Sequence, residues 1–534
     1  MKKRIISFLL VSCMLFGTLV GCGNTKEEQP VGSGKLTIGI PQSANVTSYD
    51  DNAFTSYVEE SLGIKIEFIY FASAAADYGK QITLMCTSGE KLPDVLWGFT
   101  GIDRYTVAAY GEDGYFKDLT ELIDKYGDNY KAALGKLPKD EQKMITSRGT
   151  SVTDGGFYGM PAYSASQGVD DIQTPVYINQ TWLDKVGMSK PTNVDELYNV
   201  LKAFREKDPN GNGEADEIPI LSKGIENYII NAFVCLGDYG FNVTDGKVWN
   251  PYTTDEYRQA LIYCNKLCSD KLLDKMNYTI SSSSEFKTLV TPSNDIARVG
   301  VFSGHPQSVT STTTGILDQY TALNPLADET DKGGYVVIKP KALAYSSYIT
   351  KDCDDDVTAM KFLDFFYLDE TVTRLRYGVK DEHWKYEEGI TNAYGIPCEI
   401  KLLDATAVTM GNATWGVNGL GIRTTENYSS DPDDGKSARN QNCRRLLGEA
   451  YHCAYDWEQP KEMLANLVYT EAENEERSSV SGMYQSYVNE AKTLFITGEK
   501  DPNNDAHWNE YLNQIKNLGE EKLLKIAQDA YSRK

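Results

Sequence analysis

The chain has 534 residues, of which 41% are hydrophobic and 24% are charged, a balance typical of a globular protein that dissolves in water. Its formal net charge of −23 argues against binding to nucleic acid or to an anionic membrane surface. A chain of this length exceeds what one hydrophobic core usually supports, so we expect two or more lobes.

Residues 1–21 have the three-part layout of a secretory signal peptide. Cationic residues 2 to 4 precede an apolar run that ends at Val20, and this run is too short to span a bilayer comfortably. The residues from Leu19 to Cys22 resemble the bacterial lipobox, in which an enzyme cuts before the cysteine and a diacylglyceryl group is attached to its sulfur. We therefore predict a lipid on Cys22 and a flexible tether over residues 22–34. The alternatives are a signal without a lipid and one uncleaved membrane helix.

After the tether, strand and helix signals alternate. Leu36–Ile40, Lys65–Phe71 and Leu92–Trp97 have the apolar patterns of strands, and Ser48–Leu62 and Ala74–Ser88 between them have helical patterns. This order predicts a mostly parallel sheet whose carboxyl edge faces a crevice.

The glycine-rich stretch Gly155–Pro161 predicts a crossing to a second lobe. That lobe begins near Val176, continues with a helix over Val194–Glu206 and has a strand at Glu217–Leu221. Arg298–Phe302 predicts a strand that returns towards the first lobe. We therefore assign residues 35–165 and 300–375 to the first lobe, and residues 166–299 and 376–534 to the second.

The segment from 208 to 217 (DPNGNGEADE) predicts a calcium-binding loop. It has oxygen-bearing side chains at positions 1, 3, 5, 9 and 10 and a glycine at position 6, and Ca²⁺ takes six to eight oxygen ligands. Pro219 stands where an EF-hand loop has its bidentate glutamate, so Glu217 must take that role and the ion would hold the loop rather than switch it. The alternative is a turn without any metal. The donors would be the side chains of Asp208, Asn210, Asn212, Asp216 and Glu217 and the backbone carbonyl of Glu214.

Several short segments, in this order along the chain, are similar to those of one family. They are Tyr158–Pro161, Trp182–Gly187, Pro191–Glu196, the loop from Asp208 to Pro219, Phe495–Gly498, Trp508, Tyr511 and Asp529–Tyr531. On these residues the chain resembles the extracellular solute-binding proteins of carbohydrate ABC transporters, in the group of alginate-oligosaccharide binders and Gram-positive lipoproteins. Residues 178–181 depart from the family, because we would expect an arginine and an aspartate ahead of the tryptophan. No ligand contact is therefore carried over from this strand.

The resemblance implies a two-lobed α/β fold of the periplasmic-binding-protein type (type II), with mixed sheets flanked by helices and a hinge of crossing strands. It also implies a ligand cleft between the lobes and a structural Ca²⁺ in the loop. The lipid would hold the protein at the extracellular face of a Gram-positive cell membrane, beside an ABC-transporter permease. We expect a monomer that binds an oligosaccharide, touches the membrane only through its lipid and does not bind nucleic acid.

A sugar cleft needs aromatic rings for the C–H face of a pyranose and polar side chains for its hydroxyls. Aromatic residues make up 11% of the chain. The candidate contacts lie at strand ends, after the crossing or in glycine-rich surroundings, and the alternative for each is packing in the core or on the surface. They are Trp97, Tyr163, His305, Trp384, Tyr394 and Trp415.

A lipid-anchored enzyme that degrades polysaccharide is one alternative function, because 76 acidic residues could supply a catalytic pair. The sequence has no G-x-S-x-G, H-E-x-x-H, P-loop or dinucleotide motif, and its four histidines are far apart. We therefore predict a binding protein rather than an enzyme. A surface adhesin would need repeats, which we do not find, and a receptor for peptide or another solute stays open.

Eight cysteines remain after Cys13 leaves with the signal and Cys22 takes the lipid. They form no C-x-x-C pair and have no zinc spacing. We expect buried small hydrophobes or occasional disulfides.

Overall fold

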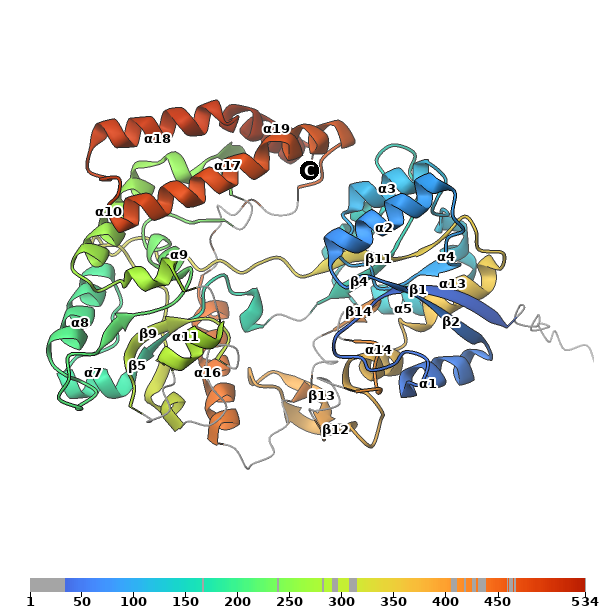
Figure 1. Ribbon diagram of the computed structural model, residues 1–534, viewed down its shortest axis with the longest axis horizontal. Coiled ribbons are helices and arrows are strands. Elements are labelled where there is room, and N and C mark those ends of the chain that lie inside the picture. Colours follow the sequence, from blue (N-terminus) through green and yellow to red (C-terminus); the bar gives the residue numbers. More distant parts are fainter. Residues whose placement is uncertain are drawn as a thin grey trace, which may run out of the picture.

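The computed structural model contains two lobes that lie side by side, each built around one β-sheet (Figure 1). No helix in the described residues has both the length and the apolarity of a membrane span. The structure describes residues 34–165, 168–237, 240–280, 283–290, 296–306, 315–404, 411–416, 419–424, 429–430, 438–458, 460, 464 and 467–533. Cys22 and the predicted signal lie outside these residues.

The first lobe contains a six-stranded mixed sheet with the strand order β14–β4–β11–β3–β1–β2. β1 pairs in parallel with β2 and β3, β11 is antiparallel to β3 and β4, and β14 is parallel to β4. The predicted parallel start of the sheet is therefore present. The strands are Lys35–Pro41 (β1), Lys65–Phe71 (β2), Val95–Leu96 (β3), Met160–Ser164 (β4), Leu343–Ile349 (β11) and Gly421–Arg423 (β14).

Helices surround this sheet, and their ends follow local sequence signals. α1 begins after Asn52, whose side chain accepts a hydrogen bond from the backbone of Phe54, and it ends at Gly63, whose φ of 64° favours glycine. The helices are Ala53–Leu62 (α1), Ala75–Ser88 (α2), Arg104–Glu112 (α3), Thr120–Tyr126 (α4), Asp128–Gly135 (α5), Lys139–Gly149 (α6), Asp356–Phe365 (α13) and Asp369–Tyr377 (α14).

The second lobe contains a four-stranded sheet with the order β10–β5–β9–β6, in which only β6 and β9 are parallel. Its strands are Val176–Asn179 (β5), Ile218–Ile220 (β6), Val299–Ser303 (β9) and Tyr320–Ala322 (β10), and a hairpin joins Asn242–Thr244 (β7) to Lys247–Trp249 (β8). Its helices are Gln180–Val186 (α7), Val194–Glu206 (α8), Ile225–Ile230 (α9), Asp255–Ser269 (α10), Ser283–Val290 (α11), Ala438–Tyr455 (α16), Glu471–Thr497 (α17), Asp505–Asn517 (α18) and Glu520–Ser532 (α19).

α16 is held against the sheet of the second lobe through Glu449. One oxygen of this carboxylate accepts hydrogen bonds from the hydroxyl of Thr321 (2.8 Å) and the backbone N–H of Ala322 (2.9 Å). The other accepts from Arg445 at 2.6 Å. Burial raises the pKa of Glu449, but these bonds outweigh it and hold the pKa below its ordinary value.

The lobes are connected by segments that run side by side. β4 leads towards β5, and the segment after β10, seen in yellow between the lobes, leads back to β11 (Figure 1). Ile172 and Ile338 form an antiparallel bridge between these two segments, and the backbone N–H of Gln173 donates to the carbonyl of Val337 at 2.8 Å. β14 in the first lobe and α16 in the second also follow one another along the chain, with β15 between them. These segments form the predicted connection of crossing strands.

The points of crossing differ from the expected boundaries. We expected the strand near residue 300 to return to the first lobe, but β9 pairs with β5 and β6, and β10 stays in the same sheet. We also expected the chain from residue 376 onwards to lie in the second lobe, whereas β14 pairs with β4 in the first sheet. The reason is that β9 is buried along its whole length, a pattern that marks a central strand without saying which sheet contains it.

A small third sheet lies between the lobes at one side of the molecule (Figure 1). Its strands are Trp384–Thr391 (β12), Pro397–Leu402 (β13) and Ser429–Ser430 (β15). The guanidinium of Arg444 on α16 donates to the carbonyls of Thr391 (3.0 Å) and Asn392 (3.3 Å). The β12–β13 turn is thereby fixed to the second lobe.

The eight cysteines among the described residues are free thiols, seven of them buried and Cys453 partly exposed. The structure therefore favours small buried hydrophobes over disulfides, which were the two alternatives.

Candidate functional site

An open cavity of about 380 Å³ lies at one edge of the first sheet. The carboxyl ends of β4 and β14 line it, together with the amino end of β11, the helix α14 and Thr100 in the loop after β3. Because β11 is antiparallel to β3, all these strand ends meet at the carboxyl edge of β1 and β3. Open α/β sheets bind ligands at this edge. We call it the sheet-edge cavity.

Two arginines line the sheet-edge cavity, Arg376 from the last turn of α14 and Arg423 at the end of β14. The Nε of Arg376 donates to the hydroxyl of Tyr377 at 3.3 Å. The carbonyl of Arg423 accepts a hydrogen bond from Ala165 (2.8 Å), which fixes this residue to the first crossing segment. Guanidinium groups here can donate several hydrogen bonds to hydroxyls or carboxylates of a ligand.

Tyr163 lines the same cavity, as its position after the predicted crossing suggested, but only 3% of its surface is exposed. Its hydroxyl donates to Glu141 at 2.6 Å, and Glu141 also pairs with Lys341 at 2.6 Å. Burial and the neighbouring carboxylate raise the pKa of Tyr163, so the hydroxyl stays protonated. Tyr163 thus forms part of the wall with its hydroxyl already bonded.

Trp97 and Trp415 lie behind the wall of the sheet-edge cavity, in the core of the first lobe. They are 2% and 3% exposed, and their rings meet edge to face at a centroid distance of 5.1 Å. Trp415 donates its indole N–H to Thr55 at 2.7 Å. An added methyl group on Gly419 would lie 2.8 Å from the ring of Trp97, so glycine lets the wall approach the indole. These positions favour core packing, the alternative that the sequence left open.

Trp384 and Tyr394 do not line the sheet-edge cavity. Trp384 is fully buried in a small cluster with Tyr377, and its indole N–H donates to the carbonyl of Gly378 at 2.8 Å. Tyr394, in the β12–β13 turn, stacks on Tyr451 of α16 with a centroid distance of 5.0 Å. Both rings hold the small sheet in place, which again favours packing over ligand contact.

His305 lies at the corresponding edge of the second sheet. β6 and β9 are parallel, and their carboxyl ends lead to Ser222 and to Gly304 and His305. The hydroxyls of Ser222 and Ser303 lie 2.6 Å apart. His305 is partly exposed and lies at the sheet edge where such folds bind ligands. It is the one residue of the second sheet's edge among the ligand contacts predicted from the sequence.

The loop Asp208–Glu217 is folded around its own carboxylates. Asp208 has a positive φ of 46°, and its carboxylate accepts from the backbone of Gly211 (2.9 Å) and Gly213 (3.0 Å). The amides of Asn210 and Asn212 donate to Asp216 at 2.9 and 3.1 Å. Four of the six predicted donors, Asp208, Asn210, Asn212 and Asp216, therefore make hydrogen bonds within one turn.

Charge and burial around this loop suit a cation. The buried Oε1 of Glu217 has no hydrogen-bond partner among the described residues, and burial raises the pKa of this carboxyl. Arg298, just before β9, contacts Asp216 at 3.0 Å. No three His, Cys, Asp or Glu side chains of the described residues are grouped as metal ligands, but the predicted donor set also includes two asparagine side chains and a backbone carbonyl. An all-oxygen donor set with a buried, unpartnered carboxylate oxygen fits Ca²⁺.

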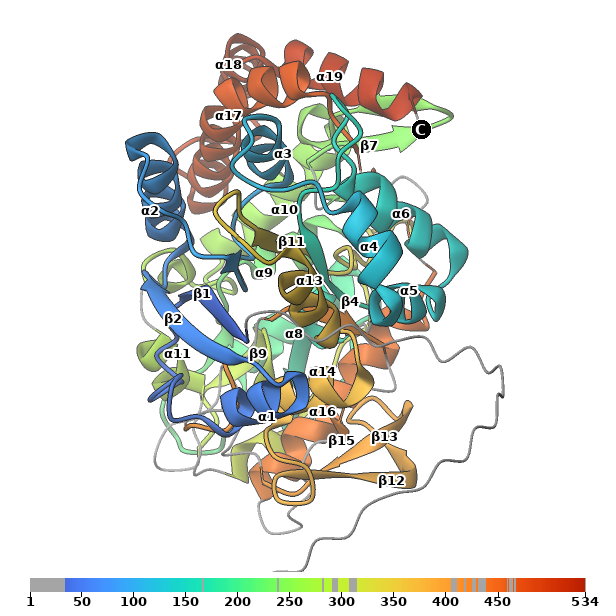
Figure 2. The ribbon, with the colours of Figure 1, turned by 90° about the vertical axis from the view of Figure 1, so that its right-hand side faces the viewer.

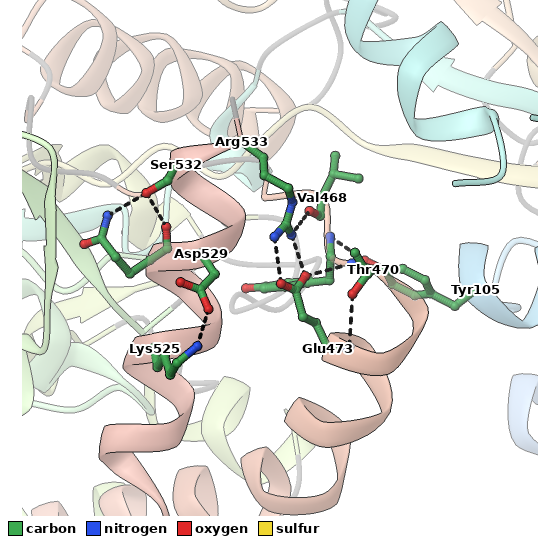
Figure 3. A network of polar contacts seen from close by, with 10 residues as sticks. Tyr105, Val468, Thr470, Glu473, Lys525, Asp529, Ser532 and Arg533 are labelled. Atoms are coloured by element: carbon green, nitrogen blue, oxygen red, sulfur yellow. Dashed lines mark hydrogen bonds and ion pairs between the residues drawn. The ribbon is translucent and has the colours of Figure 1, made fainter. Parts of the chain in front are cut away.

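The lobes also touch away from the crossing segments, at the end where α18 and α19 lie beyond α2 and α3 (Figure 2). The hydroxyl of Tyr105 on α3 accepts a hydrogen bond from the backbone of Tyr469 at 3.0 Å. Arg533 holds that segment to α19, because it donates to Glu473 (2.7 Å) and to the carbonyl of Val468 (3.2 Å; Figure 3). This hydrogen bond joins α3 to the segment just before α17.

Sequence reasoning did not single out Arg376 and Arg423. Arg376 is one of several charges on an amphipathic helix, and β14 has only three residues. In the sequence, α14 looks like an ordinary surface helix and β14 like part of a loop. Only the folded structure shows that both lie beside β4. The signal that could have helped is the expected carboxyl edge after β3, which Thr100 marks.

Comparison with known proteins finds similarity to a family of solute-binding proteins over part of the chain. Residues 43–227 match the family of bacterial extracellular solute-binding proteins. The chain is 30% identical to the fructooligosaccharide ABC transporter substrate-binding protein FusA of Streptococcus pneumoniae, over 41% of this chain and 40% of FusA. It is 23% identical to the lipoprotein LipO of Bacillus subtilis, over 94% of this chain and 93% of LipO.

Solved structures share the fold over nearly the whole chain. An HMO-binding, ABC-transporter-associated solute-binding protein from Bifidobacterium longum infantis has a TM-score of 0.75 at 20% identity, covering 94% of this chain and 99% of that protein. FusA, in a form described as an EF-hand mutant in complex with fructo-nystose, has a TM-score of 0.70 at 21% identity, with 93% and 99% covered. These matches confirm the two-lobed fold and the predicted resemblance, and the relatives are solute-binding proteins rather than enzymes.

Proposed function

We propose that this chain, a relative of the substrate-binding proteins of carbohydrate ABC transporters, is the extracellular receptor of such a transporter. It would bind an oligosaccharide between its lobes and deliver it to the permease. The observation that carries this proposal is the sheet-edge cavity. It opens at the edge of the first sheet where open α/β sheets bind ligands, and its lining includes one guanidinium group at the end of α14 and one at the end of β14. The similarity to FusA supports carbohydrate as the ligand.

The proposed mechanism is a hinge between two states. The crossing segments connect the lobes, and a ligand that touches both lobes would favour the closed arrangement. From the first lobe the ligand would meet Arg376 and Arg423, and from the second lobe His305. Tyr163 would form part of the cavity wall, and Trp97 and Trp415 would support that wall from the core.

We further propose that Asp208, Asn210, Asn212, Asp216, Glu217 and the carbonyl of Glu214 hold a structural Ca²⁺. Bound there, the ion would neutralise the loop carboxylates. The loop leads directly into β6, where the N–H of Ile218 donates to the carbonyl of Arg298 at 2.7 Å. A rigid loop would therefore fix the register of β6 on β9. The EF-hand mentioned for FusA supports this assignment.

We also propose a lipid on Cys22, a tether over 22–34, a location at the outer face of the cell membrane and a monomeric state. The description of LipO as a lipoprotein supports the lipid. An enzyme that cleaves its ligand is the alternative, and a ligand recovered intact distinguishes the two.

The test is thermal unfolding of the soluble chain from Gly23 onwards with a panel of neutral and acidic oligosaccharides. A ligand at a hundred times its Kd adds about 2.7 kcal/mol to the free energy of unfolding, which gives an upward shift of Tm. Such a shift with intact ligand is the expected result. Cleaved ligand would favour the enzyme, and no shift across the panel would contradict an oligosaccharide receptor.

A further inference from the structure

We infer that Arg104 of the first lobe and Glu471 of the second form an ion pair when the lobes close, and that this pair acts as a latch between α3 and α17. The inference rests on the hinge motion of the proposed function and adds to it a contact away from the sheet-edge cavity. It starts from a second pocket, of about 30 Å³, that both lobes line. We call it the interlobe pocket.

The interlobe pocket lies beside the hydrogen bond between Tyr105 and the backbone of Tyr469. Residues of α3, the end of α6 and Tyr345 line it from the first lobe, and Glu471, the first residue of α17, lines it from the second. Tyr105 reaches here to the chain just before α17 (Figure 3). A pocket of about 30 Å³ has room for about one water molecule. A small movement of the lobes therefore brings its two sides into contact.

Arg104 lies where its charge needs a partner. Its Nη1 is buried and has no hydrogen-bond partner among the described residues. Arg104 is also the first residue of α3, where the helix dipole disfavours a positive charge. Burial lowers the pKa of Arg104, and the charge of Arg148 lowers it further, but a guanidinium group stays protonated. A carboxylate that reaches Nη1 would supply both the missing hydrogen bond and the opposite charge.

Of the carboxylates near this pocket, Glu471 is the best placed to pair with Arg104. Glu112 lines the pocket too, but it lies at the other end of α3 and accepts a hydrogen bond from the hydroxyl of Ser151 at 2.8 Å. Glu473 is already bonded to Arg533 at 2.7 Å. Glu471 is exposed and is in the first turn of α17, where the helix dipole favours a negative charge.

Both partners are carried by helix ends that are fixed within their own lobes. Asp103 caps α3 and accepts from the backbone of Tyr105 at 3.0 Å. Thr470 and Glu473 form a capping box at the start of α17. An ion pair between two fixed helix ends lowers the free energy of the closed arrangement and leaves the open one unchanged. The latch would therefore set how readily the lobes close before and after a ligand binds.

Hydrogen exchange tests the latch without any ligand. The amide of Tyr469 donates to the other lobe, so its exchange reports how often the lobes separate at this point. The soluble chain from Gly23 onwards is exchanged, and peptides that contain this amide are followed by mass spectrometry. We expect Arg104→Gln and Glu471→Gln each to speed its exchange about threefold or more, and the double variant to be no faster than the single ones. Salt should speed the exchange of the wild type, because it screens the pair, and should leave the double variant unchanged.

Controls separate a charge pair from a general loss of packing. Glu475→Gln is the matched control, because Glu475 is exposed on the same helix and does not line the pocket. It should exchange like the wild type. Arg104→Lys keeps the charge and should keep part of the protection. The Tm of every variant is measured, and Glu471→Gln keeps the test decisive if Arg104→Gln does not fold, because Glu471 is exposed.

The outcomes separate the latch from the proposed function. Exchange in Glu471→Gln equal to that of the wild type would overturn the latch, and so would additive effects of the two substitutions. An effect of Arg148→Gln as large as that of Arg104→Gln would overturn the assigned partner. None of these results depends on an oligosaccharide, so the receptor function stands or fails by the binding panel alone.

Discussion

Replacement of Trp97 by alanine separates core packing from ligand contact. The side chain is 2% exposed, and its ring lies 5.1 Å from Trp415 and 5.3 Å from Phe366 between ring centres. Its buried indole N–H has no partner among the described residues, so the substitution removes packing and no hydrogen bond. A buried Trp→Ala change costs about 3 to 5 kcal/mol. We expect the upper half of that range, because the aromatic neighbours cannot easily fill the space.

Urea unfolding followed by circular dichroism measures this loss, and calorimetric binding at a low temperature measures affinity in the same variant. Trp249→Ala, on the β7–β8 hairpin, is the control, because this ring is only partly buried and should cost clearly less. We expect Trp97→Ala to lower stability first and affinity only through the distorted wall at Gly419. A stability loss below about 1 kcal/mol together with abolished binding would refute the core assignment.

Three further predictions follow from the loop, from α16 and from the contact between the lobes. Chelator should lower the Tm of the wild type, and Asp208→Ala with Asp216→Ala should abolish that dependence; a wild-type melting curve that chelator leaves unchanged would contradict the Ca²⁺ site. Because the folded pKa of Glu449 is depressed, its stabilising effect is present above the ordinary glutamate pKa of about 4.3 and is lost as the pH falls through the folded value. Glu449→Gln should therefore flatten the fall of Tm between about pH 5 and 3, and a parallel curve would contradict this reasoning. Tyr105→Phe removes the acceptor for Tyr469, a bond worth about 0.5 to 1.5 kcal/mol, so it should shift the balance between open and closed lobes; an unchanged radius of gyration and affinity would show that the contact has no such effect.

Much of the fold could be predicted from the sequence because the first lobe follows local rules. The alternation of strands and helices up to Trp97 predicted a parallel start to the sheet, and β1 to β3 have that arrangement. The loop at 208–217 was also visible, since its spacing depends on neighbouring residues alone. The lobe boundaries were harder, because β9 and β14 are short strands whose partners lie far away in the sequence.

The candidate site was predicted less well for a physical reason. Aromatic residues near glycines suggested a sugar-binding surface, but the rings of Trp97 and Trp415 pack in the hydrophobic core of the first lobe. A large ring gains most by full burial, and sequence alone does not distinguish a ring that backs a cavity from one that faces it. Arg376 and Arg423 come together only through pairing between β4 and β14.

The unpaired thiols have a consequence for how this protein can be followed. Burial raises the pKa of Cys86 to about 11, so at neutral pH almost no reactive thiolate exists while the first lobe is folded. Cys264, in the core of the second lobe, is shielded in the same way. Modification of either residue then requires local opening. The two cysteines are therefore probes of local opening, one in each lobe. The rate at which a thiol reagent labels each of them reports how often that lobe opens.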